Sequence, residues 1–169
     1  GHGHQHFSDI QKLPNLHAMI ALLRDGFHPQ SEGGSIELAG DGTPIIDYVI
    51  NDYLWDGVRR SWLSMAEIQF AAGAKAVRAS HVDSPWFTSW EEAKAGINAL
   101  EFRSNAFTAG SAHCMGGLTM GEDQTRCLVD SNGKYHHLDN LYVFDGSVFP
   151  TSIGANPQLS IYGMACKQA

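Results

Sequence analysis

The pattern of apolar and polar positions predicts short strands over the first half of the chain. Residues 35–39 alternate enough for one strand, and residues 44–50 are β-branched and extended behind a leading proline that favours a sheet edge. The Gly-Asp-Gly sequence at 40–42 has the composition of the turn between them. Residues 16–23 form a short apolar run typical of a buried strand, and residues 76–79 suggest another short strand.

Helical periodicity follows this sheet. Asn51 or the next residue can cap a helix whose apolar positions recur three and four residues apart as far as Gly73, a natural helix terminator. Ser89 and Glu92 have the spacing of a capping box, which predicts a second helix over residues 90–100.

The composition changes after residue 105. Small residues dominate positions 108–121, and an apolar strand is expected at 141–144. A final helix is expected over residues 158–167, where Pro157 suits the first helical position. The chain is therefore predicted to be α+β, with an antiparallel-sheet portion over residues 1–105 and the strand–loop–helix of an α/β domain over residues 106–169.

Composition excludes several classes of function. The formal net charge is −7 and no basic run occurs, which disfavours nucleic acid as a partner. No apolar stretch is long enough for a membrane span. Charged residues make up only 17% of the chain, a low share for a small independent domain. This composition is consistent with a segment that packs against other protein and also with a Gly-rich enzyme. The three cysteines argue against a disulfide framework.

Three histidines alternate at the start of the chain: His2, His4 and His6. On a strand they would share one face and could hold a metal ion. A tag remnant or a His-rich loop explains the same pattern, and no nearby carboxylate or cysteine completes a ligand set. We therefore assign no metal site.

Two places could carry chemistry. His113 lies among small residues, which leave room for a substrate beside a ring that can act as a general base. The loop that holds Asn156 delivers the chain into the last helix, whose free N–H groups can bind an anion. From residue chemistry alone, two alternatives stay open: His113 can be a structural histidine, and the loop that holds Asn156 can be an ordinary loop without a ligand.

Four segments resemble the glucose–methanol–choline family of flavoenzymes. HCMGGLTMG at 113–121 resembles the H-x-x-G-[T/G]-x-x-M-G segment of that family, and NLYVFDGSVFPT at 140–151 is similar to its N-L-x-V-x-D-[AG]-S-x-x-P-T segment. GANPQLS at 154–160 resembles its G-x-N-P helix entry, and residues 30–38 resemble a strand of its substrate domain more loosely. The three segments at 113–121, 140–151 and 154–160 occur in the order and at the spacing of the family.

The resemblance implies an FAD-dependent oxidoreductase that oxidises an alcohol or sugar hydroxyl by hydride transfer to flavin. It implies that His113 is the base for the hydroxyl proton and that Asn156 donates a hydrogen bond to the substrate oxygen. The start of the last helix would point at the N1–C2=O edge of the flavin. Cofactor contacts are implied for Asp145, Gly146, Asn156, Pro157 and Gln158.

The family binds the ADP half of FAD through a G-x-G-x-x-G turn, which this sequence lacks. The resemblance thus implies a portion of the substrate domain over residues 1–105 and the C-terminal segment of the FAD-binding domain over residues 106–169. We expect an N-terminal FAD-binding portion, as a separate chain or a missing segment, and poor FAD binding by the isolated chain. Two alternatives stay open: a flavin-containing lyase on the same fold, and a non-catalytic or metal-binding fragment.

Overall fold

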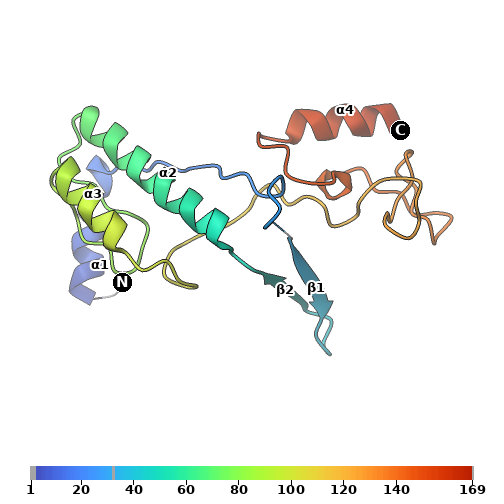
Figure 1. The fold of residues 1–169 in the computed structure, drawn as a ribbon, viewed down its shortest axis with the longest axis horizontal. Coiled ribbons are helices and arrows are strands. Elements are labelled where there is room, and N and C mark those ends of the chain that lie inside the picture. The colour runs from blue at the N-terminus through green and yellow to red at the C-terminus, as the bar shows by residue number, and fades with distance from the viewer. Residues whose placement is uncertain (1–2, 32, 169) are drawn as a thin grey trace.

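The computed structural model describes residues 3–31 and 33–168 and shows a mixed α+β arrangement. Within these residues the chain forms four α-helices, two short 3-10 helices and one two-stranded sheet. Figure 1 shows an elongated molecule with α2 and α3 at one end, α4 at the other and the β1–β2 hairpin projecting between them. The elements in chain order are α1 (Gly3–Ile10), η1 (Leu13–Asn15), β1 (Gly34–Leu38), β2 (Pro44–Tyr48), α2 (Asp52–Ala71), α3 (Trp90–Ala99), η2 (Gly146–Val148) and α4 (Gln158–Gln168).

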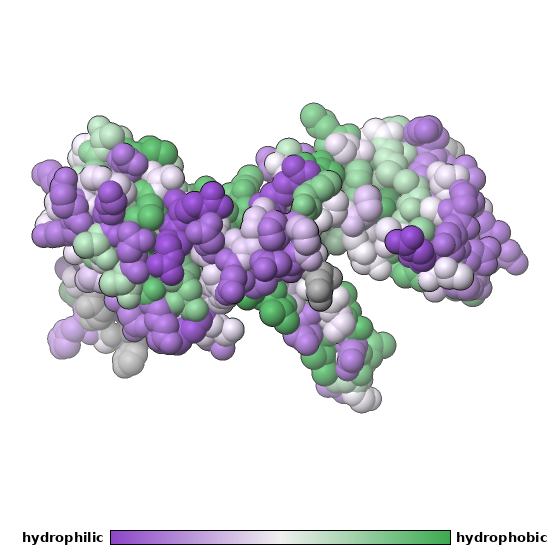
Figure 2. Space-filling view, viewed as in Figure 1, coloured by the Kyte–Doolittle hydropathy of each residue, from purple (hydrophilic) through white to green (hydrophobic). Residues whose placement is uncertain are grey.

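The β1–β2 hairpin confirms the first two predicted strands and their turn. The strands are antiparallel, with Ile36 opposite Ile46. Gly42 takes a φ of +83° in the turn, a conformation that costs glycine little. Every residue of both strands is exposed, and apolar side chains cover much of the hairpin surface in Figure 2.

Local capping explains the two long helices. The Asn51 side chain accepts a hydrogen bond of 3.0 Å from the Leu54 amide at the start of α2, as the sequence predicts. At α3, the Ser89 hydroxyl accepts from the Glu92 amide at 3.2 Å. The cap by Ser89 is thus confirmed, and the Glu92 carboxylate reaches back to the amide of Thr88, the residue before the cap, at 2.9 Å.

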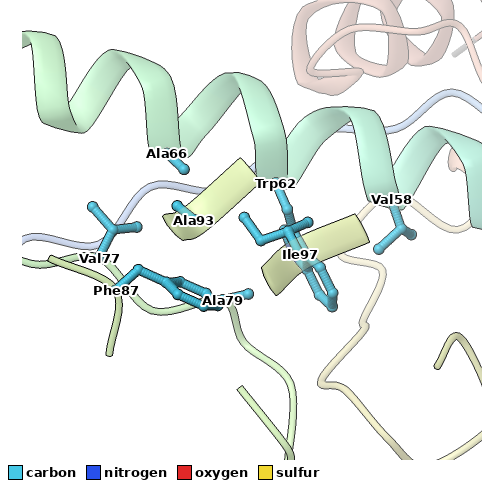
Figure 3. Close-up of a cluster of buried hydrophobic side chains, with 8 residues drawn as sticks. All are labelled: Val58, Trp62, Ala66, Val77, Ala79, Phe87, Ala93 and Ile97. Carbon is cyan, nitrogen blue, oxygen red and sulfur yellow. The ribbon is translucent and has the colours of Figure 1, made fainter. Parts of the chain in front are cut away.

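The main buried cluster lies between α2, α3 and the segment that joins them (Figure 3). Gly96 lets α3 approach this segment closely, because a β-carbon there would overlap the Phe87 ring. His81 is also buried, and its Nε2 lies 3.0 Å from the Glu101 carbonyl oxygen while its Nδ1 accepts from the Asp83 amide at 3.1 Å. The cluster consists of Val58, Trp62, Ala66, Val77, Ala79, Phe87, Ala93 and Ile97.

Three predicted strands are wrong. Residues 16–23 are irregular and largely exposed, with Ile20 at 89% exposure. The segment at 76–79 contributes only a single bridge, from Val77 to Phe87. At 141–144 only Tyr142 is bridged, to Lys134. A strand is defined by a hydrogen-bonded partner, and none of these segments has a partner strand within the described residues.

The strand arrangement considered for the N-terminal histidines is also wrong. Gly3–Ile10 is the helix α1, and both His4 and His6 are exposed on it. His2 lies outside the described residues. Among the residues that are described, no group of three or more His, Cys, Asp or Glu side chains has a metal-binding arrangement. None of the described helices is both long and apolar enough to cross a bilayer.

Candidate functional site

The loop that carries His113 pairs with η2. The Leu118 amide donates to the Ser147 carbonyl at 2.9 Å, and the Met120 amide donates to the Val148 carbonyl at 3.3 Å. At the start of the loop, the His113 amide donates to the Ser111 hydroxyl at 3.2 Å. These backbone bonds place two of the sequence motifs side by side.

Gly146 allows the His113 loop to lie close to η2. A β-carbon at Gly146 would lie 3.1 Å from the carbonyl oxygen of Cys114 and 3.4 Å from Cδ1 of Ile161 on α4. The space beside this glycine is thus filled by the chain itself. Asp145 caps η2, because its carboxylate accepts from the Ser147 amide at 2.8 Å and from the Ser147 hydroxyl.

The third motif turns the chain into α4. Gly154 has a φ of +71°, which favours glycine. Pro157 is buried, and its carbonyl accepts from the Ile161 amide at 2.9 Å as the helix begins. The amides of the residues before Ile161 belong to the first helical turn, whose N–H groups have no partner within a helix.

One open pocket, of about 270 Å³, lies at the start of α4 and contains both predicted catalytic residues. His113 is half-buried in this pocket and Asn156 is exposed. Two predicted cofactor residues, Asp145 and Gly146, do not line it. The lining residues are Ala112, His113, Asn156, Pro157, Gln158, Ile161 and Tyr162.

Sequence reasoning did not single out Ile161 and Tyr162. Both lie on α4, three and four residues after Gln158, so helical spacing places them on the same face as that residue. The Gln158 Nε2 group donates to the Tyr162 hydroxyl at 2.7 Å. Helical spacing from Gln158, in the helix expected over residues 158–167, could have identified both residues.

Acidic side chains beyond the pocket have structural partners. The pKa of Asp130 lies below its ordinary value, mainly because its carboxylate accepts a hydrogen bond from the Lys134 amide. The pKa of Glu122 is lowered mainly by the Ser131 side chain and then by the hydrogen bond that its carboxylate accepts from the Ser131 amide. These carboxylates therefore hold the turns that follow the His113 loop.

Comparison with known proteins identifies the family. The model of the GMC oxidoreductase family matches residues 29–165. The chain belongs to the GMC oxidoreductase family. This finding confirms the glucose–methanol–choline resemblance, and the match includes all three motifs, of which those at 113–121 and 154–160 contribute residues to the pocket.

Individual relatives agree with this GMC assignment. The uncharacterized GMC-type oxidoreductase y4nJ of Sinorhizobium fredii is 29% identical over 83% of this chain and 28% of its own length. The 6'''-hydroxyparomomycin C oxidase of Streptomyces lividus is 40% identical over 43% of this chain and 13% of its own length. The long-chain-alcohol oxidase FAO3 of Arabidopsis thaliana is 25% identical over 88% of this chain and 20% of its own length. The chain thus spans less than a third of each of these relatives.

Proposed function

We propose that this GMC chain forms one wall of an FAD-dependent site that oxidises an alcohol or sugar hydroxyl. The observation that carries the proposal is that His113 and Asn156, from motifs far apart in the sequence, line one pocket at the start of α4. The relatives named as a long-chain-alcohol oxidase and as a 6'''-hydroxyparomomycin C oxidase support an alcohol as the substrate class.

The pocket has features that fit a flavin. It opens at the N-terminal end of α4, where unpaired amides and the helix dipole favour negative charge on an oxygen or nitrogen ligand. Asn156, Pro157 and Gln158 would hold the cofactor at this end, and Asp145 and Gly146 would lie along its ribityl–pyrophosphate part. When bound, FAD supplies the acceptor for hydride from the substrate carbon.

The two polar side chains would divide the proton chemistry between them. His113 takes the proton of the substrate hydroxyl, a step of general base catalysis that contributes about 10²–10⁴ in rate. Asn156 donates a hydrogen bond from its amide to the same oxygen and holds it as negative charge develops there. The half-buried position of His113 leaves its ring accessible from the pocket.

The exposed apolar surface supports the proposal that a further FAD-binding portion packs against this chain. The hairpin leaves Ile36, Leu38 and Ile46 between 66% and 73% exposed, and Leu159 on α4 is 83% exposed. Apolar surface on this scale is typical of a protein interface. Residues 1–105 would belong to a substrate domain and residues 106–169 to the C-terminal segment of an FAD-binding domain. The remaining FAD-binding portion would cover this surface, as a separate chain or as part of a longer one.

The test is flavin reduction by substrate. The complete flavoprotein, in which this chain is joined by its FAD-binding portion, is mixed under argon with a panel of primary and secondary alcohols. Bleaching of the flavin absorbance is the expected result. A flavin that stays oxidised while the alcohol is cleaved would instead indicate a lyase. Stoichiometric yellow flavin on the isolated chain would contradict the need for a partner portion.

A further inference from the structure

The loop that carries Asn156 has little backbone support of its own. Within the described residues, no backbone hydrogen bond joins residues 150–156 to another segment. The bond from the Gly154 amide to the Ser152 hydroxyl, at 3.3 Å, stays inside the loop. Packing against other parts of the chain therefore decides how this loop lies between η2 and α4.

The Arg24 side chain packs directly on this loop. A β-carbon at Gly154 would lie 2.8 Å from Cδ and 3.0 Å from Nε of Arg24, so the arginine fills the space that a larger residue would need. Gly154 lies two residues before Asn156. Cζ of Arg24 also lies 3.7 Å from the centroid of the Phe27 ring, an arrangement that orients a planar guanidinium. Arg24 thus contacts an aromatic ring and the loop at the same time.

The residues on both sides of Arg24 pack against α2. Both δ-carbons of Leu23 lie 3.7 Å from the position of a β-carbon at Gly57. The His28 ring stacks on the Tyr53 ring, with the ring centroids 4.1 Å apart and the planes at 5° to one another. The support for the loop therefore comes from a long helix, and a rigid element positions a functional group more closely than a loop does.

We propose that Arg24 is a positioning residue, which holds the loop before α4 so that the Asn156 amide meets the reacting oxygen. This inference rests on the proposed role of Asn156 in alcohol oxidation. Arg24 acts through Gly154 and does not itself bind the substrate. A displacement of about 1 Å at a group that acts on the reacting atoms can cost about 10²-fold in rate, so the support from one side chain affects turnover.

The experiment compares Arg24→Ala with Arg59→Ala in the complete flavoprotein. Arg59 is the matched control because its Cζ also lies over a phenylalanine ring, 4.3 Å from the centroid of Phe102, but packs beside α3. Arg24→Lys is the conservative variant, since it keeps the Cδ that lies beside Gly154 and loses the guanidinium. The substrate is the alcohol of the panel that bleaches the flavin fastest, and kcat is expressed per bound flavin.

Arg24→Ala should lower kcat about ten-fold and change KM for the alcohol less than about two-fold, because the weakened hydrogen bond acts on charge that develops in the transition state. Arg24→Lys should lose less, and Arg59→Ala should change neither constant. In an Asn156→Ala background, Arg24→Ala should change kcat less than about two-fold, because the group that it positions is gone. A general effect on the fold would instead lower kcat in both backgrounds.

A readout independent of turnover is the NMR signal of the Asn156 side-chain amide, assigned as the signal that Asn156→Ala removes. This signal should shift in Arg24→Ala and stay in place in Arg59→Ala. Arg24 is exposed, so folding is expected to be retained. If Arg24→Ala loses flavin, Phe27→Leu takes its place, because it removes the ring under the guanidinium from a side chain that is 64% exposed.

Each other outcome counts against the inference. An Asn156 signal that stays in place in Arg24→Ala, or equal losses of kcat in the natural and Asn156→Ala backgrounds, would overturn it while the proposed oxidation stands. Failure of every alcohol in the panel to bleach the flavin of the natural protein would overturn the proposed function and this inference with it.

Discussion

Gly26 lies directly against the side chain of Thr151, so the segment before the hairpin packs on the loop that leads to Asn156. A β-carbon at Gly26 would overlap the Thr151 hydroxyl, and Gly26 has a φ of +108°. Two residues earlier, the Arg24 side chain lies beside Gly154 of the same loop. The position of Asn156 therefore depends on residues near the start of the chain.

Gly26→Ala should displace this loop. Overpacking and an unfavourable backbone conformation each cost on the order of 1–3 kcal/mol in folded proteins. We expect a lower free energy of unfolding in urea and, in the complete flavoprotein, lower turnover, because Asn156 would move. Adding Thr151→Ala should restore part of the stability, since it removes the overlapped hydroxyl.

The matched control is Gly40→Ala, because a β-carbon at Gly40 would meet nothing within 4 Å. It should change stability by less than about 0.5 kcal/mol. An equal loss of stability in both variants would show that Gly26 has no special contact with Thr151.

Sequence alone predicted the elements whose cause is local. Asn51 and Ser89 cap their helices through bonds to amides three residues ahead, so the evidence for α2 and α3 lies within one turn of chain. The segments at 16–23 and 141–144 were predicted as strands from their apolar composition. Whether an apolar run pairs depends on a distant partner, which the composition of the run does not specify.

The candidate site shows the same difference between features that a local motif predicts and features that depend on the fold. Motif resemblance selected His113 and Asn156, and the structure places both at one pocket. Tyr162 was missed because its contribution depends on the face of α4 that meets the pocket. Helical spacing from Gln158 indicated that face, but only the fold shows which side of α4 lines a pocket.

The core between α2 and α3 gives a second prediction. Ile97 is 1% exposed and packs in the cluster of Figure 3, so Ile97→Ala would leave a cavity. A loss of about 2–5 kcal/mol in unfolding free energy is typical of such a change. Urea unfolding followed by tryptophan fluorescence measures it, because Trp62 lies in the same cluster. Ile68→Ala on α2, where Ile68 is 53% exposed, is the control and should cost much less.

The cap of α3 predicts a pH dependence of stability. The pKa of Glu92 is lowered from its ordinary value of 4.5 because the carboxylate accepts hydrogen bonds from the Thr88 amide and hydroxyl. A carboxylate with a lower pKa in the folded state stabilises the fold fully above its unfolded pKa. That stabilisation is lost as the pH falls below 4.5 and through the folded value.

Urea midpoints measured from pH 7 down to pH 3 should therefore fall more steeply in the natural protein than in Glu92→Gln, which has no charge to lose at this position. Glu91→Gln removes a charge from the same first turn of α3 without touching the bonds to Thr88, and it should keep the steep fall. Parallel pH profiles for the natural protein and Glu92→Gln would argue against a role for this carboxylate.

The proposed catalytic pair gives the last prediction. In the complete flavoprotein, His113→Ala should lower kcat by about 10²–10⁴ because the base is lost. Asn156→Ala should lower it by about 10²–10³ because one hydrogen-bond donor to the developing charge is lost. Asn156→His keeps an N–H donor and should retain more activity than Asn156→Ala. Flavin absorbance should stay stoichiometric in His113→Ala, and turnover of the two Asn156 variants is expressed per bound flavin because Asn156 is also proposed to hold the cofactor. Full turnover in His113→Ala would mean that another group takes the hydroxyl proton, and the pocket at the start of α4 would then lose its proposed base.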